Sequence, residues 1–318
     1  MKRALTSLLS PAGLAGIAVE ATWVGLHLAL YPWGALEDRL DEATNLGVNH
    51  LPPVQRSLLV SDVEAAGTPI ILVHGVIDNR SIFTILRRSL RRRGFGRTYA
   101  LNYSPLSEDL REVAERLALL VEQVCEQTGY ERVHIIGHSM GGIIGRYYVQ
   151  CLGGDVRVHT VCTLGSPHQG SAIARFIPWP VIQQLRVDSA ILTELTEPAV
   201  GCRTRFISIW SDLDQLVVPQ RNARITHPDL RARNVLFRGI GHMSLPVDRR
   251  VVHEITQALA QLDHDGTTIT NGTTSIGSRA TRGHRSDDLE AGAVGDVGEQ
   301  GSARNGKPSG SIAPSDIG

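Results

Sequence analysis

Short apolar runs that alternate with longer amphipathic segments constrain the fold of residues 60–262 more than any other feature. The runs are typical of buried β-strands, and the segments between them space their apolar side chains as one face of a helix requires. This alternation predicts an α/β protein, in which helices cover both faces of a mostly parallel sheet. The helix over residues 107–129 is expected to be capped by Ser107 and to end at Gly129. We expect strands in residues 69–76, 98–103, 132–138, 158–167, 204–211 and 233–241, and helices in residues 81–94, 107–129, 139–154 and 247–262.

The N-terminal segment, residues 1–36, is apolar after its basic start. Between residues 4 and 36 the only acid is Glu20. The segment is long enough for a transmembrane helix, but a carboxylate near mid-span costs roughly 2.5–3.5 kcal/mol of insertion free energy. The alternatives are a signal peptide, or helices that lie on the membrane or on the domain over residues 60–262. We predict that this segment associates with a membrane. If it spans the bilayer, its basic start places the rest of the chain outside the cytoplasm of a bacterium; a cytoplasmic protein is the alternative.

The C-terminal residues 263–318 contain no aromatic side chain and are rich in Gly, Ser, Thr and Asp. Such a composition buries too little apolar surface to offset the entropy lost on ordering, so we predict a disordered tail. The chain is therefore expected to divide into the N-terminal segment, one α/β domain over residues 60–262 and this tail.

Composition excludes several classes of partner and cofactor. The 32 Lys and Arg balance the 32 Asp and Glu, so bulk charge indicates no nucleic-acid partner. The four cysteines form no Cys-x-x-Cys pair and no cluster with histidine at zinc spacing, so we expect no metal and no cofactor. They are expected to be buried thiols, with one disulfide as the alternative if the chain leaves the cytoplasm.

Ser139 stands between a predicted strand and a predicted helix, inside the sequence GHSMG. A serine at such a junction occupies a sharp, strained turn that lifts its hydroxyl clear of the carboxyl edge of the sheet. Side chains two positions away would collide with the backbone, and Gly137 and Gly141 remove the collision. The helix N-terminus favours negative charge at the same place. We therefore predict that Ser139 is a nucleophile, with Gly137, His138 and Gly141 as supporting residues.

A serine hydroxyl needs a base, and the base needs an acid that orients it. His242 follows one predicted strand, and Asp212 and Asp214 follow another. Loops that leave the carboxyl ends of parallel strands meet at one edge of the sheet, so these side chains can reach Ser139. We predict His242 as the base. We favour Asp214 as the acid because the apolar run after it would bury the neighbouring chain, whereas Asp212 could cap the turn.

Two backbone N–H groups are expected to bind the oxyanion of a tetrahedral intermediate. One belongs to Met140, the residue after the proposed nucleophile. The other belongs to Val76, because Gly75 before it gives the backbone room to turn toward the site. His74 could support this loop, and we do not expect it to act as a base.

Five segments in order resemble the bacterial lipase branch of the α/β-hydrolases. This resemblance covers about residues 68–262 and implies the α/β-hydrolase fold and hydrolysis of carboxylic esters through an acyl-enzyme. It assigns the same roles to Ser139, Asp214, His242, Val76 and Met140 as the chemistry above. The segments are ILVHGV (71–76), IIGHSMGG (135–142), TLGSPHQGS (163–171), SDLDQLVVP (211–219) and GIGHMSLP (239–246).

Other functions share part of this pattern. A thioesterase, an amidase or an acyltransferase on the same fold would use the same acyl-enzyme, and a non-catalytic binding module would be expected to have lost one of the groups. Residues 174–200 include the apolar side chains Phe176, Ile177 and Trp179. This segment is either a short lid that exposes a lipid-binding face, or a set of helices that pack against the domain in the ordinary way. The expected partners are an acyl ester or lipid substrate and a membrane surface contacted by residues 4–36.

Overall fold

The computed structural model describes residues 63–76, 80–104, 109–261 and 272–276. The predictions for residues 1–36 lie outside these ranges. In the part of the chain that is described, no helix has both the length and the apolar character needed to cross a membrane.

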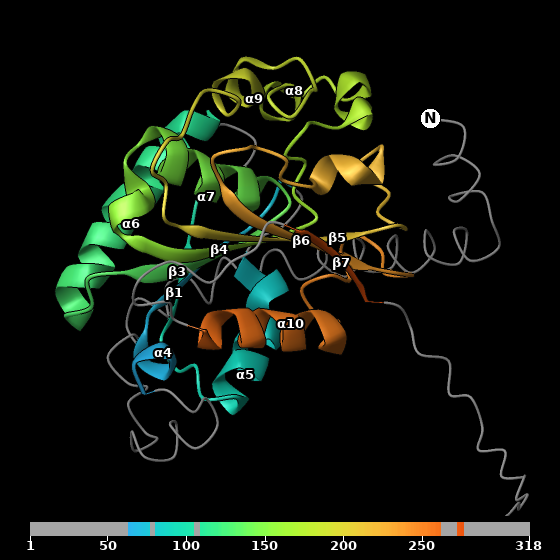
Figure 1. The fold of residues 1–318 in the computed structure, drawn as a ribbon. Helices are drawn as coiled ribbons and strands as arrows, with labels where there is room; N and C mark the ends of the chain where they lie inside the picture. Colours follow the sequence, from blue (N-terminus) through green and yellow to red (C-terminus); the bar gives the residue numbers. More distant parts are fainter. Residues whose placement is uncertain (1–62, 77–79, 105–108, 262–271, 277–318) are drawn as a thin grey trace, which may run out of the picture. The chain divides into compact units, whose positions relative to one another are not determined.

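Seven parallel strands form a single sheet (Figure 1), which confirms the parallel sheet expected from the sequence. Their order across the sheet is β2-β1-β3-β4-β5-β6-β7. The order reverses between β1 and β3, and open sheets of this kind bind ligands outside the carboxyl ends of the strands at that point. The strands are β1 (Ile70–Val73), β2 (Thr98–Leu101), β3 (Val133–His138), β4 (Val158–Leu164), β5 (Arg205–Ser211), β6 (Arg231–Phe237) and β7 (Gly272–Ile276).

Helices cover both faces of the sheet, and two separate apolar cores lie beneath them. One core involves α6, α7, α8 and α9, and the other involves α4, α5 and α10. The expected helix over residues 81–94 is split into the 3-10 turn η1 (Arg80–Phe83) and α5. The helices are α4 (Val63–Gly67), α5 (Thr84–Arg92), α6 (Leu110–Thr128), α7 (Met140–Cys151), α8 (Pro180–Gln183), α9 (Ala190–Glu194) and α10 (Arg249–Ala260); the remaining short turns are η2 (Gly154–Val156), η3 (Ala172–Phe176) and η4 (Gln220–Ala223).

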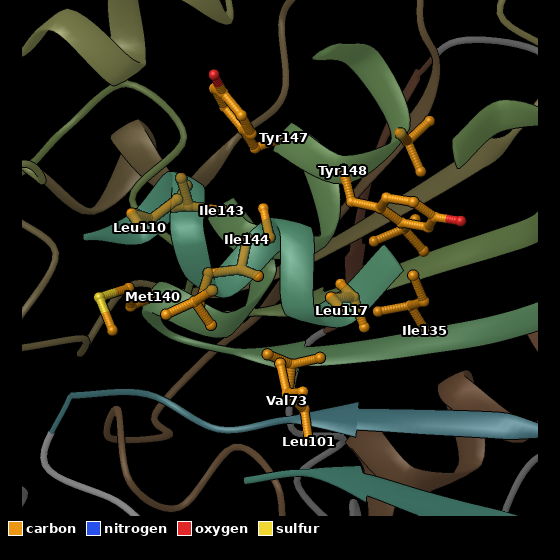
Figure 2. Close-up of a cluster of buried hydrophobic side chains, with 14 of the residues drawn as sticks. Val73, Leu101, Leu110, Leu117, Ile135, Met140, Ile143, Ile144, Tyr147 and Tyr148 are labelled. Atoms are coloured by element: carbon orange, nitrogen blue, oxygen red, sulfur yellow. The ribbon is translucent and has the colours of Figure 1, made fainter. Parts of the chain in front are cut away.

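Figure 2 shows how the first core holds α7 in place. Ile143 and Ile144 of α7, Leu117 of α6 and Ile135 of β3 are fully buried together. Burial of one such side chain stabilises the fold by roughly 1.5–3 kcal/mol. The helix that begins directly after Ser139 is therefore fixed by packing along its length.

The long helix α6 begins later than the sequence predicted. Its N-cap is Asp109, whose carboxylate accepts a hydrogen bond from the N–H of Arg111 at 2.8 Å. The expected cap, Ser107, lies outside the described residues, and a carboxylate two residues nearer the helix takes its place. The predicted end is confirmed, because Gly129 has the left-handed φ of 72° that closes the helix.

Strand β7 departs from the disordered tail expected over residues 263–318. Gly272–Ile276 pair in parallel with β6, from Arg233↔Gly272 to Phe237↔Ile276. Composition does not predict this strand, because the strand pairs with the backbone N–H and C=O groups at the edge of β6, and that edge exists only in the folded sheet.

The four cysteines form no disulfide. Cys125 and Cys162 are buried, whereas Cys151 is exposed, contrary to the expected burial of all four.

Candidate active site

Ser139 occupies a strained turn between β3 and α7. Its φ of 55° and ψ of −122° make it the one non-glycine residue with positive φ among the described residues. Such a conformation costs roughly 1–3 kcal/mol and persists only where the surrounding structure holds it. The N–H of Ser139 donates to the carbonyl oxygen of Leu164 at the end of β4, at 2.8 Å. The turn is thereby tied to the sheet, and Ser139 lines a cavity at its carboxyl edge.

The two glycines beside Ser139 are needed for close backbone contacts. A β-carbon on Gly141 would stand 2.0 Å from the carbonyl oxygen of Val73 and 2.6 Å from that of His74. A β-carbon on Gly137 would stand 2.4 Å from the backbone nitrogen of Gly142. These are the collisions expected from the sequence, and they show that α7 begins directly against the end of β1.

Asp214 and His242 form a buried hydrogen-bonded pair. Oδ2 of Asp214 lies 2.8 Å from Nδ1 of His242, and both side chains are 1% exposed. The other oxygen, Oδ1, accepts hydrogen bonds from the N–H groups of Leu216 and Val217 at 2.9 and 2.8 Å. The carboxylate is therefore held from both sides, and it fixes the orientation of the imidazole ring.

Asp212 takes part in different contacts. Its Oδ1 accepts a hydrogen bond from the N–H of Gly239 at 2.9 Å, and its Oδ2 lies 3.5 Å from the guanidinium of Arg238. It therefore joins the loops after β5 and β6, while Asp214 contacts His242.

Ser139 and His242 line the same cavity, together with Val76. Val76 follows β1, Ser139 follows β3 and His242 follows β6, so three loops from the carboxyl edge meet there. Met140, the first residue of α7, is fully buried. The cavity lies where the strand order reverses, which is the expected position of a ligand site in such a sheet.

The loop after β1 is held by a tyrosine that the sequence did not single out. The hydroxyl of Tyr103 donates to the carbonyl oxygen of His74 at 2.5 Å. The two rings are stacked, with centroids 4.2 Å apart and planes 4° from parallel. His74 is thus buried against Tyr103, in a supporting position beside Gly75 and Val76.

His138 supports the loop that carries His242. Its Nε2 lies 3.2 Å from the carbonyl oxygen of His242, and the two ring centroids are 4.8 Å apart. The side chain is fully buried beneath the loop. His138 therefore joins the turn at Ser139 to the backbone of His242.

Two further residues come from the segment GSPHQGS, to which no individual roles were assigned from the sequence. Gly165 has a φ of 57° and lies directly against Asp214 and His242. The hydroxyl of Ser171 donates to the carbonyl oxygen of Leu216 at 2.6 Å and accepts from the N–H of Val218 at 3.1 Å. The only signal for these residues in the sequence is their position in a segment expected near the site.

The cavity beside Ser139 has mostly apolar walls, and the empty space in and in front of it is about 570 Å³, which includes open solvent. Ile177 and Ile182, from the segment 174–200, line it. Phe176 and Trp179 of the same segment are 80% and 47% exposed. The segment thus packs inward over the cavity and also presents apolar side chains outward. The apolar wall is made by Val76, Pro167, Ile173, Ala174, Ile177, Ile182, Leu185, Leu216, Val217 and Met243.

Helix α9, at the end of this segment, is attached to α6 and α7. The guanidinium of Arg111 donates a hydrogen bond to the carboxylate of Glu194, and the distance from Nε to Oε2 is 3.2 Å. The hydroxyl of Tyr147 donates to the same carboxylate at 2.7 Å. The hydrogen bonds from Arg111 keep the pKa of Glu194 below its ordinary value. Arg146, whose pKa burial lowers to about 10, donates to the carbonyl oxygen of Leu195 at 2.7 Å.

The described residues contain no group of three or more His, Cys, Asp or Glu side chains placed to hold a metal ion.

A parallel sheet with a strained serine turn between strand and helix is the fold of the α/β-hydrolases. Solved structures confirm this fold. A lipase of Bacillus licheniformis aligns with a TM-score of 0.53 and 17% identity over 68% of this chain and 96% of its own. Lipase B of Aspergillus fumigatus aligns with a TM-score of 0.53 and 14% identity over 64% of this chain and 55% of its own.

Within this class, residues 67–181 match the model of the class 2 lipase family. A triacylglycerol lipase of Pseudarthrobacter phenanthrenivorans is 33% identical over 117 residues, which are 34% of this chain and 36% of the relative. A triacylglycerol lipase of Vibrio cholerae is 33% identical over 138 residues, 42% of this chain and 43% of the relative. The resemblance to bacterial lipases is thus confirmed, although the chain spans well under half the length of these curated relatives.

Proposed function

We propose that this chain is a serine hydrolase that cleaves carboxylic acyl esters of lipids through an acyl-enzyme intermediate. The observation that carries the proposal is that Ser139, at a strained turn, lines one cavity with His242, whose imidazole is hydrogen-bonded to Asp214. The matches to class 2 and triacylglycerol lipases support an ester substrate. The apolar wall of the cavity supports an acyl chain as the bound group.

In the proposed reaction, the hydroxyl oxygen of Ser139 attacks the ester carbonyl carbon while His242 accepts the hydroxyl proton. The carbonyl oxygen becomes an oxyanion, which the N–H groups of Val76 and Met140 stabilise. His242 then gives its proton to the departing alcohol, which leaves an ester between the acyl group and Ser139. Water, deprotonated by His242, attacks this ester and releases the acid.

Asp214 has two roles in this scheme. Its hydrogen bond to Nδ1 keeps the proton of the neutral ring on that nitrogen, so the second ring nitrogen is the one that accepts the serine proton. Its negative charge also stabilises the imidazolium that forms. The two N–H groups from Leu216 and Val217 keep the carboxylate in position.

The test is labelling of the full chain with a fluorophosphonate probe, alongside hydrolysis of nitrophenyl esters of short and long acyl chains. We expect the wild type to be labelled and active, and Ser139→Ala to lose both. Ser89→Ala, on α5 and away from the cavity, serves as a matched serine variant, which should keep the label. Labelling of Ser139→Ala at the wild-type rate would overturn the proposal.

Esters have to be separated from thioesters and amides, because the acyl-enzyme is common to all three. Substrates that share one acyl group and differ in the leaving group make this comparison. We expect the ester to have the highest kcat/KM. Preferred transfer of the acyl group to an added alcohol or amine, instead of water, would identify an acyltransferase.

We further propose that residues 4–36 hold the protein at a membrane, on the basis of their apolar composition. Cell fractionation of the full chain and of a chain without residues 1–36 tests this. The full chain is expected in the membrane fraction and the shortened chain in the soluble fraction. Equal partition of both would contradict the proposal.

A further inference from the structure

Positive charge is concentrated in one short part of this chain. Residues 79–107 contain seven arginines and no acidic residue, in a sequence whose formal net charge is zero. Most of these arginines lie on or directly after α5. Arg88, Arg91 and Arg92 are exposed on that helix.

Within the described ranges, no acid compensates these three arginines. In the part of the chain that the structure describes, no carboxylate forms an ion pair with Arg88, Arg91 or Arg92. Elsewhere arginines do pair: Arg157 lies 2.8 Å from Glu122, and Arg250 lies 3.0 Å from Asp248. The charge on α5 is therefore exposed and has no partner of opposite sign among the described residues.

The neighbouring helix α10 extends the same surface. It packs against α5 (Figure 1), and its outward side chains include Arg249, His253 and Gln257. The acid on this helix, Glu254, is buried and bonded to Arg233. We name the surface made by Ile85, Arg88, Arg91, Arg92, Arg249 and His253 the α5–α10 face.

We propose that the α5–α10 face binds the surface of an anionic phospholipid bilayer. Guanidinium groups pair with phosphate through two parallel hydrogen bonds, and arginine close to an anionic bilayer strengthens binding roughly fivefold per residue. Ile85 is 46% exposed and lies three and seven residues before Arg88 and Arg92, so all three share one side of α5. Basic and apolar side chains together suit the boundary between lipid headgroups and acyl chains.

A lipid surface fits this face better than a nucleic acid does because of what precedes it in the chain. The described residues begin at α4, which packs against α10. The 62 residues before α4 include the apolar run over residues 4–36. A bilayer is the partner that could accept both an apolar segment and a positively charged face of one chain.

The proposal does not depend on the nucleophile at Ser139. Helices α5 and α10 lie on the opposite face of the sheet from α8, which carries part of the cavity wall (Figure 1). A bilayer bound to the α5–α10 face leaves the cavity uncovered. Loss of bilayer binding is therefore expected without loss of activity on soluble esters, which separates this proposal from the proposed function.

The experiment measures co-sedimentation of the full chain with phosphatidylcholine vesicles, with and without phosphatidylglycerol, at low and high salt. The test variant is Arg88→Gln/Arg91→Gln/Arg92→Gln. The control variant is Arg116→Gln/Arg203→Gln/Arg221→Gln, which removes the same charge from exposed positions elsewhere. We expect the test variant to lose at least about tenfold in partition to phosphatidylglycerol vesicles at low salt. Both variants should partition alike to pure phosphatidylcholine vesicles.

Three results would overturn the proposal. The first is equal loss of binding in the test and control variants. The second is a loss that does not depend on phosphatidylglycerol. The third is a loss of binding to a short DNA duplex with unchanged binding to the vesicles, which would identify the α5–α10 face as a nucleic-acid surface. Circular dichroism, measured in parallel, shows that each variant is folded.

Discussion

A β-carbon on Gly165 would stand 2.9 Å from Oδ2 of Asp214, the oxygen that is hydrogen-bonded to His242. The same carbon would stand 3.0 Å from Nδ1 of His242. Gly165 also has a φ of 57°, which residues with a side chain rarely adopt. The turn after β4 can therefore pass this close to the Asp214–His242 pair only because the residue is glycine.

Gly165→Ala is expected to displace the imidazole and to lower kcat about 100-fold, because small displacements of a catalytic group are costly. Gly153→Ala is the matched control, since Gly153 has a φ of 74° and no atom within 4 Å of the added carbon. Steady-state kinetics and circular dichroism are the measurements. A similar loss in both variants would attribute the effect to backbone strain instead of contact with the pair.

Asp214→Asn is expected to lower kcat about 10³–10⁴-fold, because an amide can hold the ring with the proton on the wrong nitrogen. Asp212→Asn should keep kcat within about tenfold, since Asp212 contacts Gly239 and Arg238 instead of His242. The measurement is kcat for a nitrophenyl ester at saturating substrate. The reverse ranking would show that Asp212, and not Asp214, orients His242.

His138→Leu removes the hydrogen bond to the carbonyl oxygen of His242 and should lower kcat about tenfold with little change in KM. His138→Gln is expected to recover most of this loss, because its side-chain nitrogen can reach the place of Nε2. The comparison of kcat and KM in the two variants is the measurement. Equal activity of both variants would mean that the bond does not position His242.

Tyr103→Phe removes the hydroxyl that holds the carbonyl oxygen of His74 and leaves the ring stacking in place. We expect kcat to fall about tenfold at constant KM, since a displaced Val76 N–H stabilises the oxyanion less well. Tyr99→Phe, on β2, controls for loss of a hydroxyl elsewhere. A rise in KM at constant kcat would instead place Tyr103 in substrate binding.

Glu194→Gln should lower the free energy of unfolding at neutral pH by roughly 0.5–1 kcal/mol, because the pair with Arg111 is partly exposed and screened. Hydrogen bonds from Arg111 lower the pKa of Glu194 in the folded state. The carboxylate of Glu194 therefore contributes to the free energy of unfolding at pH values above its pKa in the unfolded state. This contribution is lost as the pH falls through its pKa in the folded state. Urea unfolding at neutral and acidic pH should show the two proteins converging in acid. A difference that persists in acid would contradict the role of the charge.

Local pattern was sufficient for the repeating parts of the fold. The continuous apolar runs of β1 and β3 predict buried parallel strands, because such strands are covered by helices on both faces. The GHSMG junction predicts the strained serine turn, because a serine placed directly between a strand and a helix requires a sharp turn with glycines two positions either side. The contact of Gly137 is with nearby backbone at Gly142, whereas that of Gly141 is with Val73 and His74 at the end of β1. Boundaries were less predictable, as the cap at Asp109 shows, because several polar residues compete to end a helix.

The sequence by itself determined that a serine, two aspartates and a histidine follow predicted strands, and in which order. It also determined that these residues lie at the carboxyl edge of the predicted sheet. Only the tertiary structure decided that Asp214, and not Asp212, contacts His242, and that Gly165, Tyr103 and His138 hold the surrounding loops. The physical reason is that each of these contacts joins loops from different strands. Their geometry is fixed by the order and register of the whole sheet, which no local pattern of residues encodes.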